Sequence, residues 1–441
     1  MQYRRLSLFA ALGSLALGAL QPVRAAVPDS VYQALDQRVK ILERLHELDQ
    51  EAAAAKAKDT PVVTANSKDG FTIKSPDGSF KLKIGGYSQG DGRFWLGDTL
   101  KARTNTFFLR RVRPQFDGTV GKYVDFRIMP DFGGGTTVLY DAYLNLTYRP
   151  GFKVQVGKFK PPIGLERLQS GAALLFVERG LPTSLVPNRD LGLQVHGDLS
   201  GGRLSYAVGV FNGVVDGGNA DTDVDDSKEL AARIFAQPFK QGTSLLQGLS
   251  LGVAGSWGNS SGALPSFRTP GQVSFFTYTD TTVANGSRVR IAPQFTYYTG
   301  PLGLLGEYTL SKQELTRKTD SATLQNSAWQ VAASYLLSGD QAGYKGVSPK
   351  KSFDPAKGQW GALELAARFH QLAIDKDAYP IFANAKRSAR SATAWALGIN
   401  WYLHRNTKLN LDYEQTQFKG GGAKGDRDAE KILFNRFQVS F

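Results

Sequence analysis

The chain contains 441 residues, and its 53 Lys and Arg exceed its 39 Asp and Glu, which gives a formal net charge of +14. Its 48 Gly, 26 Phe, 17 Tyr and 6 Trp put glycine and aromatic residues above the usual share of soluble domains. The absence of cysteine excludes disulfides and thiolate metal sites, and none of the four histidines stands at a metal-binding spacing. We therefore expect no metal site and no cofactor, and a soluble helix-rich enzyme is disfavoured.

Residues 1–25 have the features of a secretory signal peptide. Arg4 and Arg5 form its charged start, Leu6–Leu20 is apolar, and Val23–Ala25 supplies a small-residue cleavage site. The apolar stretch of 15 residues is shorter than the roughly 20 that a membrane-spanning helix needs. The sequence therefore predicts export, with a short N-terminal anchor as the alternative.

Residues 26–60 are predicted to form an amphipathic helix. Apolar residues recur there at spacings of three and four: Leu35, Val39, Leu42, Leu45 and Leu48. This narrow apolar stripe favours a short periplasmic coiled coil, and the alternative is a single fraying helix. Residues 61–70 are expected to be a linker.

From residue 71 to residue 441 the hydrophobic pattern has a period of two. In Leu249–Trp257, for example, large apolar residues alternate with Ser, Gly and Ala, as in a strand with one apolar and one polar face. The expected strands run about 9–12 residues, which is the length needed to cross a membrane at a tilt. Aromatic residues near the strand ends are typical of interfacial girdles. The sequence thus predicts an all-β fold, a 16-stranded antiparallel transmembrane β-barrel in the outer membrane, with an aqueous channel.

The sixteen expected strands and the long connections are assigned from the same pattern. The strands are predicted to begin near Ser79, Thr106, Lys122, Val138, Phe152, Asp190, Gly202, Lys228, Leu249, Arg288, Gly303, Ser327, Gly358, Ser391, Thr407 and Glu430. The longest external loops are predicted at Lys160–Arg189, Val214–Ser227, Asn259–Ser287, Ser311–Asn326 and Asp375–Arg390.

Positive charge is concentrated between Arg93 and Arg203, where 16 Lys and Arg stand against 9 Asp and Glu. Alternation in the second strand places Arg111 and Arg113 on one face. An arginine at the lipid midplane costs roughly 2–4 kcal/mol, so this face is expected to line the lumen. Arg110 falls on the opposite face, and we expect it at a strand end or a bulge. Asp141 lies on the polar face of the fourth strand.

The connection of residues 160–189 is too long for a hairpin and carries an apolar run, Ala172–Val177. We expect it to fold against the lumen wall and present the basic residues of this region, Lys158, Lys160, Arg167 and Arg179, to the channel. Arginine and lysine rings are the expected device of an anion or phosphate pore. The alternative is a solvated external cluster that binds the phosphates of lipopolysaccharide. The acidic run at Asp221–Asp226 is interpreted as a solvated loop, because the glycine and glutamate of a calcium loop are missing.

Several short sequence stretches, taken in their order along the chain, indicate the family that the chain resembles. They are Phe108-Leu109-Arg110-Arg111, Phe116-Asp117-Gly118-Thr119, Val156-Gly157-Lys158-Phe159, Gly164-Leu165-Glu166-Arg167, Glu178-Arg179, Pro187-Asn188-Arg189-Asp190-Leu191-Gly192, Ser334-Tyr335-Leu336-Leu337-Ser338-Gly339 and Leu397-Gly398-Ile399-Asn400-Trp401-Tyr402, followed by the terminal Phe441. Through them the chain resembles the phosphate-selective outer-membrane porins O and P over residues 71–441. The resemblance implies a trimer of sixteen-stranded barrels, each narrowed by an infolded third loop.

The resemblance also implies site residues. The family's basic constriction positions correspond to Arg110, Arg111, Arg167 and Arg179, and its acidic position corresponds to Asp141. Arg167 replaces a family lysine, and Arg113 and Lys160 stand where the family has aromatic or acidic residues. Tyr87 stands where phosphate-specific members have an arginine, and the family's external arginine ladder is reduced here to Arg268, Arg288 and Arg290. Anion preference is therefore better supported than strict phosphate selectivity.

The sequence thus predicts a passive, anion-selective outer-membrane channel for phosphate or polyphosphate uptake, with no enzymatic activity. The expected partners are phosphate, pyrophosphate or other small anions, outer-membrane lipid and lipopolysaccharide, and two further copies in a homotrimer; no nucleic acid is expected. The candidate anion constriction comprises Arg110, Arg111, Arg113, Asp141, Lys158, Lys160, Arg167 and Arg179. The alternatives are a general porin for organic acids or sugars, a structural barrel, and an outer-membrane phospholipase built on one of His196, His370 and His404.

Overall fold

The computed structural model describes residues 28–66, 70–97, 103–223, 225–242 and 244–441, so the predicted signal peptide lies outside the described residues. The chain divides into two units, residues 1–60 and 61–441. The first contains helix α1, Asp29–Asp59. Its apolar side chains, such as Leu42, are exposed, so the coiled coil stays a prediction. Among the described residues, no helix has the length and the apolar character needed to cross a membrane.

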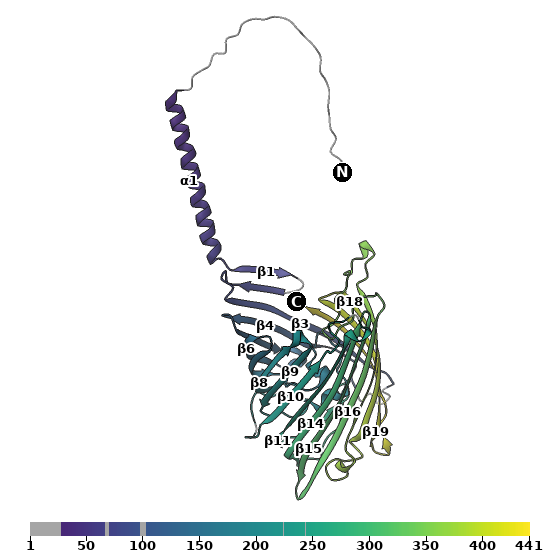
Figure 1. The fold of residues 1–441 in the computed structure, drawn as a ribbon. Helices are drawn as coiled ribbons and strands as arrows, with labels where there is room; N and C mark the ends of the chain where they lie inside the picture. The colour runs from purple at the N-terminus through teal and green to yellow at the C-terminus, as the bar shows by residue number, and fades with distance from the viewer. Residues whose placement is uncertain (1–27, 67–69, 98–102, 224, 243) are drawn as a thin grey trace. The chain divides into compact units, whose positions relative to one another are not determined.

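The second unit is a closed barrel of sixteen antiparallel strands (Figure 1). Its strands are β3 (Phe80–Trp95), β4 (Thr106–Val120), β5 (Val124–Asp131), β6 (Val138–Arg149), β7 (Phe152–Phe159), β8 (Asp190–Leu199), β9 (Leu204–Phe211), β10 (Glu229–Ala236), β11 (Leu249–Gly262), β14 (Thr282–Thr299), β15 (Leu302–Arg317), β16 (Asp320–Leu336), β17 (Ala362–Ala373), β18 (Ala389–His404), β19 (Thr407–Gly422) and β21 (Glu430–Ser440). Pairing of β21 with β3 closes the ring. The predicted fold class and strand number are confirmed.

Short strands lie outside the ring of sixteen. β1 (Val62–Asn66) and β2 (Gly70–Lys74) pair with each other, and β2 also pairs with the start of β3. The segment expected as a linker, residues 61–70, therefore contains a strand. β12 (Phe267–Arg268) pairs with β13 (Ser274–Phe276) inside the loop of residues 263–281, and β20 (Gly425–Asp426) pairs with the end of β19.

Two connections differ from the sequence prediction. Ser311–Asn326 is not a loop, because β15 and β16 remain paired up to Arg317 and Asp320. Strand ends that lie outside a membrane need no apolar outer face, because backbone pairing alone holds them. The outer faces of these ends of β15 and β16 are polar, so the alternating pattern did not reveal them as strands. Conversely, the connection of residues 337–361, on the side of the short turns, is long. It folds inward, where Tyr344 donates its hydroxyl proton to the Leu165 carbonyl at 2.5 Å.

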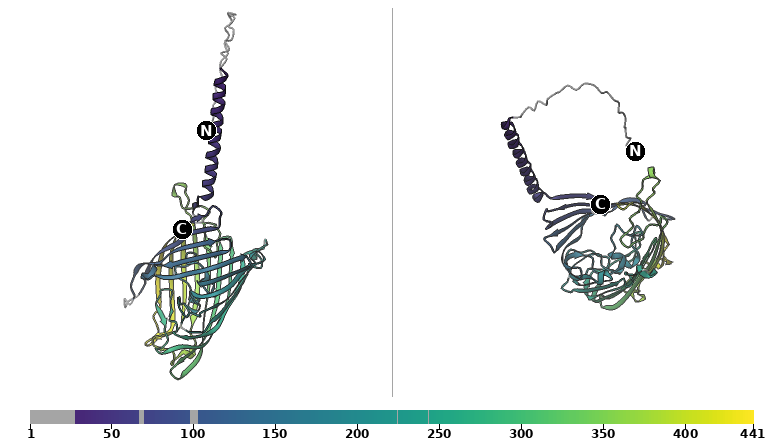
Figure 2. Two further views of the ribbon diagram at one scale, coloured as in Figure 1. Left: turned by 90° about the vertical axis from the view of Figure 1, so that its left-hand side faces the viewer. Right: turned by 45° about the horizontal axis from the view of Figure 1, so that its top comes forward.

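The two faces of the wall carry different side chains. Apolar residues such as Leu144, Val208 and Ile234 are about half exposed on the outer face. Their neighbours along each strand point inward, and many of them are buried polar groups. They are buried because segments of the chain fill the ring (Figure 2). This is the arrangement of a barrel with an apolar belt and a polar interior.

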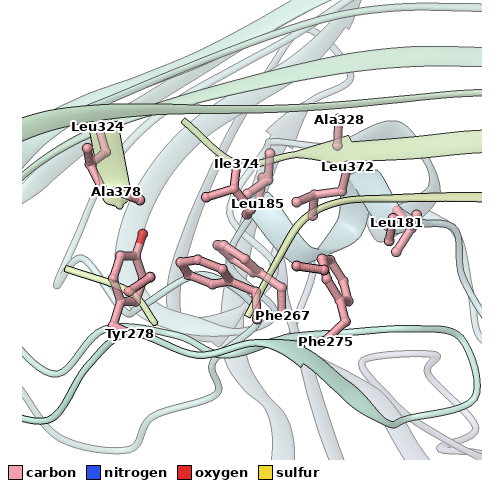
Figure 3. Packing of buried hydrophobic residues seen from close by; sticks show 14 of the residues in the cluster. Leu181, Leu185, Phe267, Phe275, Tyr278, Leu324, Ala328, Leu372, Ile374 and Ala378 are labelled. Carbon is pink, nitrogen blue, oxygen red and sulfur yellow. The ribbon is translucent and has the colours of Figure 1, made fainter. Parts of the chain in front are cut away.

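An apolar cluster holds two inward segments together. Leu181 and Leu185, from the 3-10 helix η2 (Leu181–Leu185), pack on Phe267 and Phe275 of residues 263–281 and on Leu372 of the wall (Figure 3). These side chains are at most 1% exposed, and each large apolar side chain buried in this way contributes roughly 1.5–3 kcal/mol. The cluster fixes the position of η2 inside the barrel.

Candidate functional site

A bulge in β4 directs two consecutive arginines into the barrel. Gln89 of β3 lies opposite Arg111 and Gly90 opposite Leu109, so Arg110 has no partner in the ladder. The extra residue keeps Arg111 and Arg113 on the inner face, and Arg110 also turns inward, where it lines a cavity with them. Simple alternation would place Arg110 on the outer face.

Glu178 binds both of these arginines from inside the barrel. Arg110 Nη2 donates to Glu178 Oε2 at 3.2 Å, and Arg111 Nη2 lies 3.6 Å from the same oxygen. Burial opposes ionisation of Glu178, but Arg110 and Arg111 outweigh that effect and hold its pKa well below the ordinary value. Since one carboxylate neutralises one guanidinium, the pair of arginines keeps a positive charge.

Arg113 is held by an acid and two tyrosines. Its Nε donates to Asp131 Oδ2 at 2.7 Å, and its Nη1 donates to the Tyr87 hydroxyl at 2.8 Å. The guanidinium carbon lies 3.9 Å from the centre of the Tyr140 ring, which adds a cation–π interaction. Tyr87 therefore orients an arginine here.

Residues 160–189, which we call the inward loop, are fixed to the wall along their length. Glu307 of β15 accepts the backbone N–H of Leu165 at 2.6 Å and that of Glu166 at 3.2 Å, at the start of the short helix α2 (Leu165–Leu168). Wall side chains also donate to loop carbonyls at 2.7–2.9 Å: Gln89 to Gly171, Gln438 to Ala172, Lys408 to Leu174, Asn400 to Leu175 and Arg368 to Glu178. The loop therefore presents its basic side chains from a fixed backbone.

Three cations of the inward loop bind backbone carbonyls of the same loop. Lys160 Nζ donates to the Leu168 and Gln169 carbonyls at 3.1 and 2.8 Å. Arg179 donates to the Glu166 and Gln169 carbonyls at 3.1 and 2.8 Å, and Arg167 donates to Thr183 O. No carboxylate oxygen among the described residues lies within 4.0 Å of these three charges. Carbonyl oxygens orient them without cancelling their charge.

The pKa values of these three side chains reflect crowded, buried positive charge. Burial, followed by repulsion from Arg179 and Arg189, lowers the pKa of Arg167 to about 9. Burial also lowers the pKa of Arg179. Burial and the nearby Arg189 and Arg179 hold the pKa of Lys160 well below its ordinary value. An anion placed among them would relieve this repulsion.

Arg189, at the end of the inward loop, pairs with Asp141 of β6. Arg189 Nε donates to Asp141 Oδ1 at 3.0 Å, and its guanidinium carbon lies 4.6 Å from the centre of the Tyr140 ring. Both partners of this ion pair are buried. Asp141 thus has an arginine partner that the sequence analysis did not include in the site.

The basic side chains meet in a cavity of about 410 Å³, which we call the arginine cavity. Seven arginines line it: Arg110, Arg111, Arg113, Arg167, Arg179, Arg189 and Arg268. The lining carboxylates are Glu178 and Asp216, and Asp131 and Asp141 bind Arg113 and Arg189 from behind the lining. Among the described residues, seven arginines thus stand against four carboxylates, a surplus of three positive charges. Guanidinium groups donate in pairs to carboxylate and phosphate oxygens, and the cavity is suited to such anions.

A second cavity of about 240 Å³ lies toward the short turns, and we call it the turn-side cavity. Its lining includes Lys160, Arg127 and Asp141 together with Tyr87 and Tyr143. Arg189 lines both cavities. An ion moving between the two cavities would therefore pass the Arg189–Asp141 pair.

The structure does not bring Lys158 into this group, and we remove it from the candidate site. β7 pairs in unbroken register around it, so Lys158 points away from Gln155 and Phe159, which line the turn-side cavity. Its ammonium binds Asp221 in the loop after β9. In a regular strand Lys158 and Lys160 would share a face, but β7 ends at Phe159, so Lys160 follows the course of the inward loop and Lys158 does not.

Of the three external arginines Arg268, Arg288 and Arg290, two have carboxylate partners among the described residues. Arg290 is fully buried and donates to Asp216 and Glu229, and Arg288 donates to Glu229. Of the three arginines considered for the ladder, Arg268 lines the arginine cavity. No group of three or more His, Asp or Glu suited to a metal ion occurs in the part of the chain that the structure describes.

Comparisons with known proteins agree on the architecture. A family model described as phosphate-selective porin O and P matches residues 80–441. A search of curated proteins finds no match. The outer membrane channel DcaP of Acinetobacter baumannii is similar in structure, with a TM-score of 0.56 at 12% identity over 83% of this chain and 99% of that chain.

Two further solved structures show the same fold. The anion-selective porin from Comamonas acidovorans has a TM-score of 0.51 at 12% identity, covering 82% of this chain and 100% of that chain. A loop L8 deletion mutant of OmpT from Vibrio cholerae gives the same TM-score, identity and coverage.

Proposed function

The chain belongs to the phosphate-selective porin O and P family, and we propose that it conducts small anions, phosphate or polyphosphate among them, through the two cavities joined at Arg189. Family membership makes it an outer-membrane porin. The observation that carries the proposal is the surplus of three positive charges at the arginine cavity, after the carboxylate partners of Arg113 and Arg189 are counted. The anion selectivity in the name of the Comamonas acidovorans porin is consistent with it.

The proposed mechanism needs no chemical step. Arg268, together with Arg110 and Arg111 at the bulge of β4, raises the local concentration of anions at the entrance, since a basic cleft attracts small counter-ions. The anion exchanges part of its hydration shell for guanidinium donors and leaves past Arg189, Lys160 and Arg127. Several weak sites in sequence favour entry without trapping the ion. We propose that the chain acts as a homotrimer without enzymatic activity, in contact with outer-membrane lipid and lipopolysaccharide.

Reversal potentials in planar bilayers under a potassium chloride gradient test the proposal. The wild type is expected to prefer chloride over potassium, and added phosphate is expected to lower the chloride current. The double variant Arg167→Gln with Arg179→Gln removes two arginines of the inward loop that have no carboxylate partner among the described residues, and it keeps amide donors for the loop carbonyls. It is expected to lose at least fivefold in the anion-to-cation permeability ratio, since each cation near a permeating ion contributes about 1 kcal/mol or more.

The matched control carries Lys122→Gln and Lys351→Gln, which remove the same charge from exposed positions outside the cavities. It should keep the wild-type ratio. A preference for potassium in the wild type would overturn the proposal. Anion preference without any effect of phosphate would favour a general porin for organic acids or sugars, and absence of conductance would favour a structural barrel.

A further inference from the structure

Uncompensated cations gather on the outer face of the barrel, away from the channel. Four exposed basic residues stand on strands β15, β18, β19 and β21 near their ends on the long-loop side. We call them the outer cation rim: Lys312, Arg390, Lys419 and Lys431. Among the described residues, no carboxylate oxygen lies within 4.0 Å of any of their charges. They are therefore free to bind an external anion.

The register and the bulges of the wall give these side chains their direction. Lys312 and Lys419 lie next to the buried Gln313 and Phe418 and so point to the opposite, outer side. Arg390 lies at a shift in register between Ala389 and Ser391, as the extra residue of a bulge, and it is exposed. The rim therefore faces the surroundings of the barrel and not its lumen.

The rim lies beyond aromatic residues of the same outer face. The ring centres of Trp395 and Tyr413 lie 5.3 Å apart, with the rings tilted by 51°. Tyr413 precedes Lys419 by six residues, and Tyr308 precedes Lys312 by four. Aromatic side chains on a membrane barrel mark the interface between hydrocarbon and headgroups. Lys312, Arg390 and Lys419 lie four to six residues closer to the outside than these aromatic residues, at the level of the headgroups of the outer leaflet. Lys431 pairs with Gln415, which pairs with Trp395, so it lies at the level of the aromatic residues themselves.

The outer faces of these four strands offer little competing negative charge. In the described chain, the outward carboxylate on β15, β18, β19 and β21 is Glu314, and it already accepts the Ser287 N–H at 3.0 Å. The other carboxylates of these strands, such as Glu414 and Glu430, are buried on the inner side. The exposed outer residues of β10 and β11, such as Leu230, Val253 and Asn259, carry no charge. The charge is thus confined to one side of the barrel.

We propose that the outer cation rim binds the phosphate groups of anionic lipid in the outer leaflet. Lysine and arginine bind phosphate oxygens by charge-assisted hydrogen bonds. The positions of the rim residues on the lipid-facing side put them beside lipid headgroups and not in the path of a permeating ion. This proposal depends on the barrel's position in the outer membrane and is independent of the ion that the channel conducts.

Native mass spectrometry of the purified mature protein in detergent tests the proposal. The probes are lipid A with two phosphates and the same lipid without phosphates. The variant carries Lys312→Gln, Arg390→Gln, Lys419→Gln and Lys431→Gln. Each cation near an anionic lipid surface contributes roughly a fivefold gain in affinity, so occupancy by the phosphorylated lipid is expected to fall at least tenfold. The phosphate-free lipid should bind weakly to both proteins.

A control variant removes the same charge from the turn side through Lys74→Gln, Lys81→Gln, Lys122→Gln and Lys351→Gln, all at exposed positions. It should bind phosphorylated lipid A as the wild type does. Undiminished binding by the rim variant, or equal binding of both lipids by the wild type, would overturn the proposal. A changed oligomeric state of the rim variant would also overturn the proposal, because it would show that the rim contacts a second copy of the chain. A changed anion-to-cation ratio in neutral bilayers would likewise assign the rim to ion attraction.

Discussion

Changing the charge of the Arg189–Asp141 pair tests whether permeating ions pass this pair between the two cavities. Arg189→Gln removes the cation and leaves Asp141 as an uncompensated carboxylate beside the path. For a monovalent anion about 6 Å from that carboxylate, the repulsion is roughly 0.7 kcal/mol in a water-like medium and roughly 2.8 kcal/mol at an effective dielectric constant of 20. We therefore expect the anion-to-cation permeability ratio to fall roughly 3- to 100-fold.

The reverse substitution and the double variant separate charge from structure. Asp141→Asn leaves Arg189 charged and should raise the ratio. In the double variant the carboxylate and the guanidinium are both gone, so its ratio should return toward the wild-type value. A double-mutant cycle then measures the coupling between the two side chains. Reversal potentials in a potassium chloride gradient supply all four values.

The exposed pair Lys153 and Asp198, at the turn side of β7 and β8, offers a matched control. Lys153→Gln, Asp198→Asn and their combination change the same charges at a distance from both cavities, and they should leave the ratio unchanged. If Arg189→Gln keeps the wild-type ratio, or if the double variant is as impaired as Arg189→Gln alone, ions do not pass this pair and the path must be sought elsewhere.

Two further predictions concern the inward loop. Because the pKa of Arg167 is about 9 and that of Lys160 is well below its ordinary value, both lose charge as the pH rises. The anion-to-cation ratio of the wild type should therefore fall between pH 7 and pH 10, and that of Arg167→Gln should fall less; equal titration curves would contradict this. Glu307→Gln removes one of the two oxygens that accept the loop N–H groups, a loss of roughly 1–3 kcal/mol. The amide protons of residues 165 and 166 should then exchange at least fivefold faster, whereas Glu314→Gln on the outer face should leave them unchanged.

The barrel could be predicted because its strands obey a local rule. Apolar and polar residues alternate because each strand has one apolar and one polar face, and the pattern is easily recognised when it extends over ten or more consecutive residues. The rule loses its physical basis where a strand leaves the membrane. Residues 282–287 and 320–326 lack a continuous apolar outer face, although Ala284 and Leu324 are buried on the inner side. The predicted starts at Arg288 and Ser327 therefore lie several residues after the observed starts of β14 and β16. The inward fold of residues 337–361 has no local signal either, since Tyr344 finds its partner in another loop.

The candidate site was predictable only as far as one strand or one loop determines it. Alternation was sufficient for Arg111 and Arg113, because their direction depends on β4 alone. The role of Arg189 follows from its contact with Asp141, 48 positions earlier in the chain, and nothing in the spacing indicates that contact. The separation of Lys158 from Lys160 depends on a boundary that periodicity does not locate, since β7 ends at Phe159.

The arginines of the arginine cavity differ in their partners, and under the proposed function this difference gives a prediction for Arg167 and Arg179. Arg113 and Arg189 each have a carboxylate partner, which offsets part of the cost of burying their charge. Arg167 and Arg179 are partly buried against carbonyl oxygens of the inward loop, and burial lowers the pKa of each, so among the described residues they lack the stabilisation that a carboxylate partner would give their charge. A fold that needed only stability would place an acid or an apolar residue there. Under the proposed conduction of anions, a passing anion relieves the repulsion among these side chains. We therefore expect replacement of both arginines by glutamine to stabilise the barrel and to lower its anion selectivity.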